Sequence, residues 1–259
     1  EIFRRMAEMM GVEMQFTETK TMDELLQFAY EKATISKQVP FEEFWERGWV
    51  DMDTPDEAND WVRHGDFRAD PDKHRLHTES GKVEMFCETI AAQKLDDCPG
   101  IPKYLEAAEF LGNAKEGQVH VVSPHPYYRL HSQMANADRV RARHAIQDRE
   151  PCLISTEDAE LRGIKDGDLI EVYNDRGAII VGAVVSDNIM KGVISIYEGC
   201  WPSVDSKGRC NSGLVNFLTS SRRSSGLSQA TTANTCLASV KKCNDPDGPN
   251  AAYNPPNIL

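Results

Sequence analysis

The chain has 259 residues, of which 40% are apolar and 27% charged, and its formal net charge is −12. This composition is ordinary for globular proteins, and the length suffices for one large or two modest domains whose cores need no disulfide or metal. The negative charge argues against duplex nucleic acid or an anionic membrane as a partner, because both attract basic surfaces.

The sequence contains no targeting signal and no apolar run near the roughly 20 residues that a membrane helix needs, so membrane insertion is not expected. The chain begins at Glu1, already inside a helical pattern. We therefore expect a piece of a longer protein, and the missing signals say nothing about that parent.

The first hundred residues are expected to be mostly helical. Thr21 and Glu24 have the spacing of a capping box at the start of a helix over 22–33. Pro40 begins another helix that ends near Gly48. Further helices or helical turns are expected at 2–10, 55–62 and 103–111.

Near residue 117 the apolar pattern changes to that of strands. Asn174-Asp175-Arg176-Gly177 is a strong hairpin turn between strands over 168–173 and 178–185. Ser155 or Thr156 can cap a short helix that runs through Leu161. Other strands are expected at 119–122, 193–197 and 237–241. The short strands are numerous enough to close a small barrel, and no internal repeat is visible.

The seven cysteines include no Cys-x-x-Cys pair, so the spacing of zinc fingers and redox motifs is absent. Cys200 and Cys210 could be bridged, but free and partly buried thiols are the simpler expectation.

The polar string from Ser123 to Gln133 directly follows the strand expected at 119–122. Two prolines fix the backbone around His125, and the planar guanidinium of Arg129 suits a phosphate or a ring carbonyl. Such a loop could read the edge of a heterocycle, although a solvated face is the plainer interpretation of the arginines here. A metal site at His125 and His131 is not favoured, because the sequence places no third ligand near them.

Four strings, taken together, resemble a known family. They are the H-P-x-x-R-L-H-S-Q string at 125–133, the glycine-punctuated segment 155–199, the N-x-L-T, L-S-Q and A-N-T strings within 216–235, and the segment 76–84, expected as a strand and turn. In their order along the chain and at these spacings they resemble the C-terminal cofactor-binding domain of the dimethyl sulfoxide reductase family. The first string is similar to that of the subgroup reducing trimethylamine N-oxide, dimethyl sulfoxide or biotin sulfoxide. The resemblance covers almost the whole chain.

This resemblance implies a mainly β fold. Residues 116–259 would form a double-psi β-barrel of the aspartate-decarboxylase-like type, which is the molybdopterin dinucleotide-binding domain of the family. Residues 1–115 would form a mostly helical segment that belongs to a larger domain of the parent enzyme.

The resemblance also implies a function. The parent would be a periplasmic N-oxide or S-oxide reductase, most similar to trimethylamine N-oxide reductases, with a bis(molybdopterin guanine dinucleotide) molybdenum cofactor and a cytochrome-type electron donor. The serine that ligates molybdenum in this family lies in an N-terminal domain, and no part of this chain corresponds to it. We therefore expect the isolated chain to be inactive and to lack the cofactor. Its partners would be the N-terminal domains of the same parent chain.

The residues that match the family's strings are the candidate cofactor-binding residues: Ser123, His125, Arg129, His131, Ser132, Gln133, Asn216 and Gln229. No catalytic residue or metal ligand is assigned in this chain. If the eight residues read one flat heterocycle, they should converge on one concave, solvent-open surface. The stretch Ser220–Ser225 departs from the family, where an Asp-containing segment is expected, and Cys200 with Trp201 has no assigned role.

Other functions stay open at this point. A self-cleaving decarboxylase of the same fold needs a Gly-Ser dipeptide, which this sequence lacks. A non-catalytic barrel used as a binding module fits the polar loops but has no need for the helical first hundred residues. A formate dehydrogenase or nitrate reductase relative is disfavoured only by the string at 125–133.

Overall fold

The computed structural model describes residues 2–18, 20–50 and 62–255, which form two compact units, 1–83 and 84–259. The helix expected at 55–62 lies almost entirely outside the described residues. Within the described ranges, no helix has the length and apolar character required to cross a membrane. The domain boundary expected between residues 115 and 116 stays a prediction.

The first unit is helical over most of its described part. Its helices are α1 (Ile2–Met10), α2 (Glu13–Thr17), α3 (Met22–Lys32), η1 (Thr34–Lys37), α4 (Phe41–Arg47) and α5 (Gly65–Ala69). The capping box predicted at Thr21 and Glu24 is confirmed, because each residue binds the backbone N–H of the other. Tyr30 stacks on Phe44 with ring centroids 4.7 Å apart, which packs α3 against α4.

The residues between α5 and the first strand are mostly irregular. They contain only α6 (Glu88–Ala91) and η3 (Leu111–Asn113). Two expectations are therefore wrong. The segment 76–84 forms a turn closed by the Leu76 N–H on the Gly81 carbonyl, without a strand, and 103–111 contains no helix beyond the start of η3. The chain here is fixed by side-chain contacts that propensity does not encode, such as that of Glu109 with Arg176 described below.

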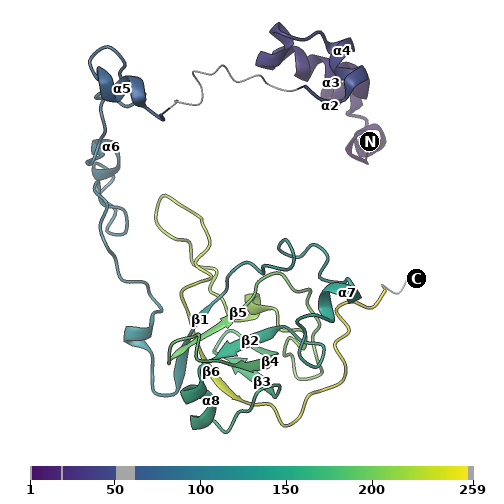
Figure 1. Cartoon of the computed structure of the whole chain (residues 1–259), viewed down its shortest axis with the longest axis vertical. Helices are drawn as coiled ribbons and strands as arrows, with labels where there is room; N and C mark the ends of the chain where they lie inside the picture. The colour runs from purple at the N-terminus through teal and green to yellow at the C-terminus, as the bar shows by residue number, and fades with distance from the viewer. Residues whose placement is uncertain (1, 19, 51–61, 256–259) are drawn as a thin grey trace. The chain divides into compact units, whose positions relative to one another are not determined.

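Six strands close a barrel in the second unit (Figure 1): β1 (Gln118–Val122), β2 (Pro151–Ile154), β3 (Leu169–Tyr173), β4 (Ala178–Val185), β5 (Val193–Ile196) and β6 (Cys236–Lys242). Their order around the barrel is β1-β5-β2-β4-β3-β6, and the pairs β1–β5 and β2–β4 are parallel while the others are antiparallel. Replacing each strand by the one three places along the chain reproduces the same neighbours and directions. This two-fold topology, with one parallel crossing in each half, is that of a double-psi barrel, so the predicted fold class is confirmed.

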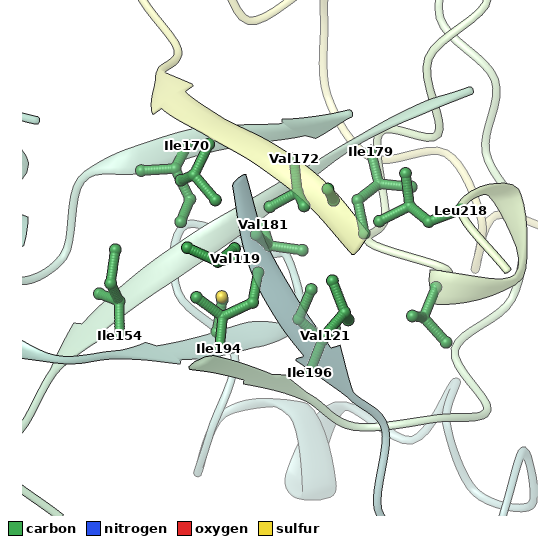
Figure 2. Close-up of a cluster of buried hydrophobic side chains, with 14 of the residues drawn as sticks. Val119, Val121, Ile154, Ile170, Val172, Ile179, Val181, Ile194, Ile196 and Leu218 are labelled. Atoms are coloured by element: carbon green, nitrogen blue, oxygen red, sulfur yellow. The ribbon is translucent and has the colours of Figure 1, made fainter. Parts of the chain in front are cut away.

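The barrel core consists of the alternate residues of each strand (Figure 2). Val119 and Val121 of β1 face inward, as do Ile194 and Ile196 of β5, and all four are fully buried. β-branched side chains suit this pleated interior because their stiff χ1 rotamers pack well against neighbouring strands. Strands β2, β3 and β4 contribute Ile154, Ile170, Val172, Ile179 and Val181 to the same core.

The connections of the barrel follow the sequence signals closely. The hairpin turn at 174–177 is confirmed, with the Asn174 N–H donating to the Gly177 carbonyl between β3 and β4. Ser155 caps α8 (Thr156–Leu161) by accepting from the Asp158 N–H. The strand β2 was not predicted, because its four residues begin with a proline and follow the charged stretch 148–150.

The strand directions place two long connections, 123–150 and 197–235, at one end of the barrel. β1 and β5 are parallel neighbours, so the segments that leave them at 123 and 197 emerge together. β6 runs antiparallel to β1, so the segment that enters it up to 235 arrives at the same end. The two connections that contain the eight candidate cofactor-binding residues therefore meet at this end of the barrel.

Candidate functional site

Asn234 joins the segment 216–235 to the polar string 123–133 at the end of β1. Its side-chain oxygen accepts the Ser123 N–H at 2.7 Å, and its carbonyl oxygen lies 2.8 Å from Nε2 of His120. Ser123 is buried, and its Oγ has no hydrogen-bond partner among the described residues. A buried hydroxyl without a partner is costly, so Ser123 offers a donor and acceptor for a ligand at this edge.

The buried guanidinium of Arg129 holds the backbone of the loop 123–133 in place. Its side chain is 0% exposed and lies 3.1 Å from a carboxylate oxygen of Glu150, which is 4% exposed. Its Nε donates to the His131 carbonyl at 2.9 Å and its Nη2 to the Glu198 carbonyl at 2.8 Å. The guanidinium thus bonds to groups inside the protein, and Arg129 is buried beneath the loop that it supports.

His125 and His131 meet at a residue that the sequence analysis missed. Nδ1 of His125 lies 2.7 Å and Nδ1 of His131 2.5 Å from the same oxygen of Glu198, with the two rings nearly perpendicular. Burial would raise the pKa of Glu198, but the hydrogen bonds from the two histidines outweigh it and the pKa is lowered. Glu198 lies two residues after the end of β5 and precedes Gly199, and this change from apolar strand to charged residue and glycine was the one available signal.

The backbone around this cluster is closely packed. His131 has a φ of +49°, a left-handed conformation that is uncommon for residues other than glycine. Gly199 has a φ of +89°, and a Cβ at this position would lie 2.5 Å from the carbonyl carbon of His131. Only glycine therefore allows the segment after β5 to approach the loop this closely.

Ser132 and Gln133 follow in an exposed turn in which the Gln133 N–H donates to the Leu130 carbonyl. The carbonyl of Ser132 accepts Nε1–H of Trp201 at 3.1 Å. Trp201, left without a role by the sequence analysis, therefore fixes the end of the loop.

Asn216 and Gln229 line one hollow of about 680 Å³, together with hydroxyl side chains and two arginines. Its further lining residues are Thr219, Ser220, Ser221, Arg222, Arg223, Ala230, Thr231 and Thr232. The structure thus brings these two distant residues together, but the hollow includes no residue of the loop 123–133. The convergence of all eight candidate residues on one surface stays a prediction.

A second hollow of about 530 Å³ shares Ser220, Arg222, Arg223 and Thr232 with the first, and its other lining residues include the carboxylates of Asp97, Glu106 and Glu109. One of these, Glu109, accepts both terminal nitrogens of Arg176, at 2.8 and 2.9 Å, and the Leu237 N–H at 2.8 Å. Arg176 also donates to the Leu218 carbonyl at 2.6 Å. This contact ties the irregular segment before the barrel to the hairpin turn and to β6.

A buried polar cluster lies behind the loop. Tyr128 stacks on His144 with ring centroids 3.7 Å apart, and Nε2 of His144 lies 4.0 Å from Glu150. Burial and the nearby charge of Arg129 lower the pKa of His144 to about 4. Burial raises the pKa of Glu150, although Arg129 opposes this. His144 is therefore neutral at pH 7.

All seven cysteines are free, as the composition led us to expect. Cys200 and Cys210 are both buried and each lies within hydrogen-bond range of the Ser212 hydroxyl, without a bridge between them. Burial raises the pKa of the Cys152 and Cys200 thiols, which keeps them protonated.

Comparison with known proteins matches the barrel to one family. Residues 119–237 fit the family model described as molydopterin dinucleotide binding domain. A trimethylamine-N-oxide reductase from Haemophilus influenzae is 39% identical over 255 residues, covering 93% of this chain and 31% of the relative. A dimethyl sulfoxide/trimethylamine N-oxide reductase from Cereibacter sphaeroides is 41% identical over 255 residues, covering 93% of this chain and 30% of the relative.

A solved structure shows the same fold. The acetylene hydratase from Pelobacter acetylenicus matches with a TM-score of 0.66 over 93% of this chain and 32% of that chain, at 17% identity. The chain spans about a third of the length of the curated relatives that it matches. It therefore belongs to the dimethyl sulfoxide/trimethylamine N-oxide reductase family of molybdopterin oxidoreductases, and its barrel is the molydopterin dinucleotide binding domain.

Proposed function

We propose that this chain is the C-terminal part of an N-oxide or S-oxide reductase, most similar to trimethylamine N-oxide reductases, and that its barrel closes over a bis(molybdopterin guanine dinucleotide) cofactor. The observation that carries the proposal is the placement of the polar segments. The loop 123–133, Glu198 and the segment 216–235 all lie at one end of a barrel whose family is named for binding this class of dinucleotide.

The residues at this end fit such a group. The hollow around Asn216 and Gln229 offers amides, hydroxyls and two guanidinium groups, which can bind the edges of a heterocycle and the phosphates of a dinucleotide. Ser123 adds a buried hydroxyl whose hydrogen bonding is unsatisfied within the described chain. A mixed set of donors and acceptors around an open hollow is what a large polar ligand requires.

Individual residues receive distinct roles in this proposal. Asn216 and Gln229 bind from the hollow, while the exposed side chains of His125, His131, Ser132 and Gln133 bind from the loop. Arg129, for which the sequence implied direct contact, acts through the backbone of His131 and Glu198, which it holds in place.

When bound, the molybdenum cofactor would supply the oxygen-transfer and two-electron chemistry, with electrons from a cytochrome-type donor. This chain's own residues would bind and orient the dinucleotide, and Pro124, Pro126 and Arg129 would hold the loop rigid. The other side of the site would come from the N-terminal domains of the same parent. We propose a periplasmic location for the parent on the same relationship.

A formate dehydrogenase or nitrate reductase type of enzyme is the second candidate, because the barrel fold occurs in a relative as distant in sequence as acetylene hydratase. The two relatives at 39% and 41% identity favour the N-oxide and S-oxide reductases. The choice between them lies in the substrate that the parent reduces.

The test uses the parent enzyme, expressed in a host that makes the cofactor, and the chain 1–259 alone. We expect one molybdenum and two pterin dinucleotides per parent and trimethylamine N-oxide reduction, but no retained molybdenum and no activity in the chain alone. An Asn216→Ala, Gln229→Ala double variant of the parent should lose cofactor content. A Leu161→Ala variant, on the exposed side of α8 at the other end of the barrel, serves as the control. A double variant with full pterin content would contradict the site, and a parent without pterin would contradict the function.

A further inference from the structure

His125, His131 and Glu198 form a cluster that no comparison assigns to a metal. One ligand atom from each residue lies within 4.8 Å of the other two, and no other group of three His, Cys, Asp or Glu residues in the described ranges does so. The side chains are 74%, 55% and 30% exposed, so an ion can reach them from solvent. A metal was not favoured from the sequence because no third ligand lies near the two histidines along the chain, and Glu198 supplies that ligand from the segment after β5.

The ligand set has a definite chemical preference. Two imidazoles and one carboxylate suit Zn²⁺ and the neighbouring divalent transition metals, whereas Ca²⁺ and Mg²⁺ prefer oxygen ligands alone. Three protein ligands would leave a fourth position for water.

The cluster is held in place by parts of the fold that do not belong to it. Gly199 lets the backbone of Glu198 approach His131, and the buried guanidinium of Arg129 binds the carbonyl oxygens of both residues. Pro124 and Pro126 restrict the backbone on either side of His125. The backbones of the three ligands are therefore fixed before any ion arrives, which lowers the entropic cost of binding.

We propose that His125, His131 and Glu198 bind a divalent transition-metal ion, with Zn²⁺ as the best fit. Ligand atoms around a tetrahedral zinc are ~3.3 Å apart. The two Nδ1 atoms lie 2.7 and 2.5 Å from the Glu198 oxygen, so the partly exposed carboxylate must withdraw by less than ~1 Å. Each Nδ1 must lose its proton, which moves to Nε2 of the same ring or to solvent.

This proposal does not rest on the cofactor function, although it has a consequence for it. His125 and His131 are also proposed to face the dinucleotide, so metal and dinucleotide would compete for the same imidazoles. The zinc site would then belong to the chain without its cofactor. Zinc binding is therefore measured on the chain 1–259 and cofactor content on the parent, so that the failure of one proposal leaves the other standing.

The experiment titrates the chain 1–259, treated with chelator, with ZnCl₂ by calorimetry and with Co²⁺ by visible absorption. We expect one site, and a cobalt spectrum without the thiolate charge-transfer band that the half-buried Cys87 or Cys98 would give. The test variants are His125→Gln, His131→Asn and Glu198→Gln. Asn is chosen at position 131 because it tolerates the left-handed backbone there.

Each test variant should weaken Zn²⁺ binding by about tenfold or more, since even the loss of a residue that only orients a ligand costs about that much. The control His77→Gln removes an exposed histidine outside the cluster and should bind like the unaltered chain. Circular dichroism confirms that each variant is folded. The proposal is overturned if the unaltered chain shows no saturable binding, if all three variants bind normally, or if the cobalt spectrum shows thiolate ligation.

Discussion

Gly199 lies so close to His131 that an added Cβ would stand 2.5 Å from the His131 carbonyl carbon and 2.6 Å from its oxygen. The contact joins the segment after β5 to the loop after β1, and both segments carry candidate site residues. We expect Gly199→Ala to lower the free energy of unfolding by at least ~2 kcal/mol, through the clash and the strained positive φ. Urea denaturation of the chain measures this loss.

The matched control for that substitution is Gly208→Ala. Gly208 has a similar φ of +78°, but nothing lies within 4 Å of the added Cβ. It should cost only about 1 kcal/mol, the backbone penalty alone. Equal losses in the two variants would show that the approach of Gly199 to His131 contributes no stability.

Arg129 gives the second prediction, because its side chain is 0% exposed and bonded to Glu150 and two carbonyl groups. Arg129→Lys should destabilise the chain by about 2 kcal/mol, since a lysine cannot reach all three partners in one plane. Arg129→Met should cost about 3–5 kcal/mol by leaving Glu150 buried and unpaired.

A double variant, Arg129→Met with Glu150→Gln, separates the two effects of that change. It should cost less than the sum of the single variants, because the unpaired charge is removed. If Arg129 instead contacts the cofactor directly, Arg129→Lys would lower cofactor content in the parent while leaving the stability of the chain unchanged.

The third prediction concerns acid stability. The pKa of His144 is lowered from 6.5 to about 4 by burial and by the charge of Arg129. The unfolded chain therefore binds the proton more readily, and this contribution to stability is present above about pH 6.5 and is lost as the pH falls toward 4. Relative to a His144→Gln variant, the unaltered chain should lose up to ~3 kcal/mol across this window.

Urea denaturation at several pH values, performed on both proteins, measures that difference. Glu150 and Arg141 lie near His144, and the raised pKa of Glu150 acts in the opposite direction. Because both proteins retain these groups, the difference between them isolates His144. Parallel stability curves would mean that His144 titrates normally.

The barrel core gives the fourth prediction. Ile194 is fully buried among residues of several strands, so Ile194→Ala should lower the free energy of unfolding by about 2–5 kcal/mol. Met190 lies four residues earlier and is 64% exposed, and Met190→Ala should change stability by less than ~0.5 kcal/mol. Thermal or urea unfolding of the two variants tests whether the interior is packed as described.

The sequence predicts those parts of the fold that local chemistry determines. The hairpin at 174–177, the capping box at Thr21 and the Ser155 cap each depend on residues within four positions of one another, and all three are confirmed. Strand β2 was not predicted, because four residues starting at Pro151 are too few to show an alternating apolar pattern. The segments 76–84 and 103–111 were wrongly expected to be regular, because long-range contacts such as Glu109 with Arg176 fix such a chain without secondary structure.

The candidate site could be predicted from the sequence less completely than the fold. Resemblance selected His125, His131, Asn216 and Gln229, and the structure brings them together in pairs rather than all at once. Glu198 was missed because its partners lie 67 and 73 residues away along the chain, and no local pattern encodes such a pairing. The burial of Arg129 could not be predicted either, because it depends on the pairing of its guanidinium with the buried Glu150, 21 residues away.

The two halves of the barrel are equivalent in topology but unequal in what they carry. The connection from β1 to β2 runs over 123–150, whereas its counterpart from β4 to β5 needs only 186–192. Since the strand exchange that equates the halves also reverses the barrel, the short counterpart lies at the opposite end. The opposite end carries none of the eight candidate cofactor-binding residues. A tag, a tether or a grafted loop near the exposed Met190 would therefore leave the polar end undisturbed.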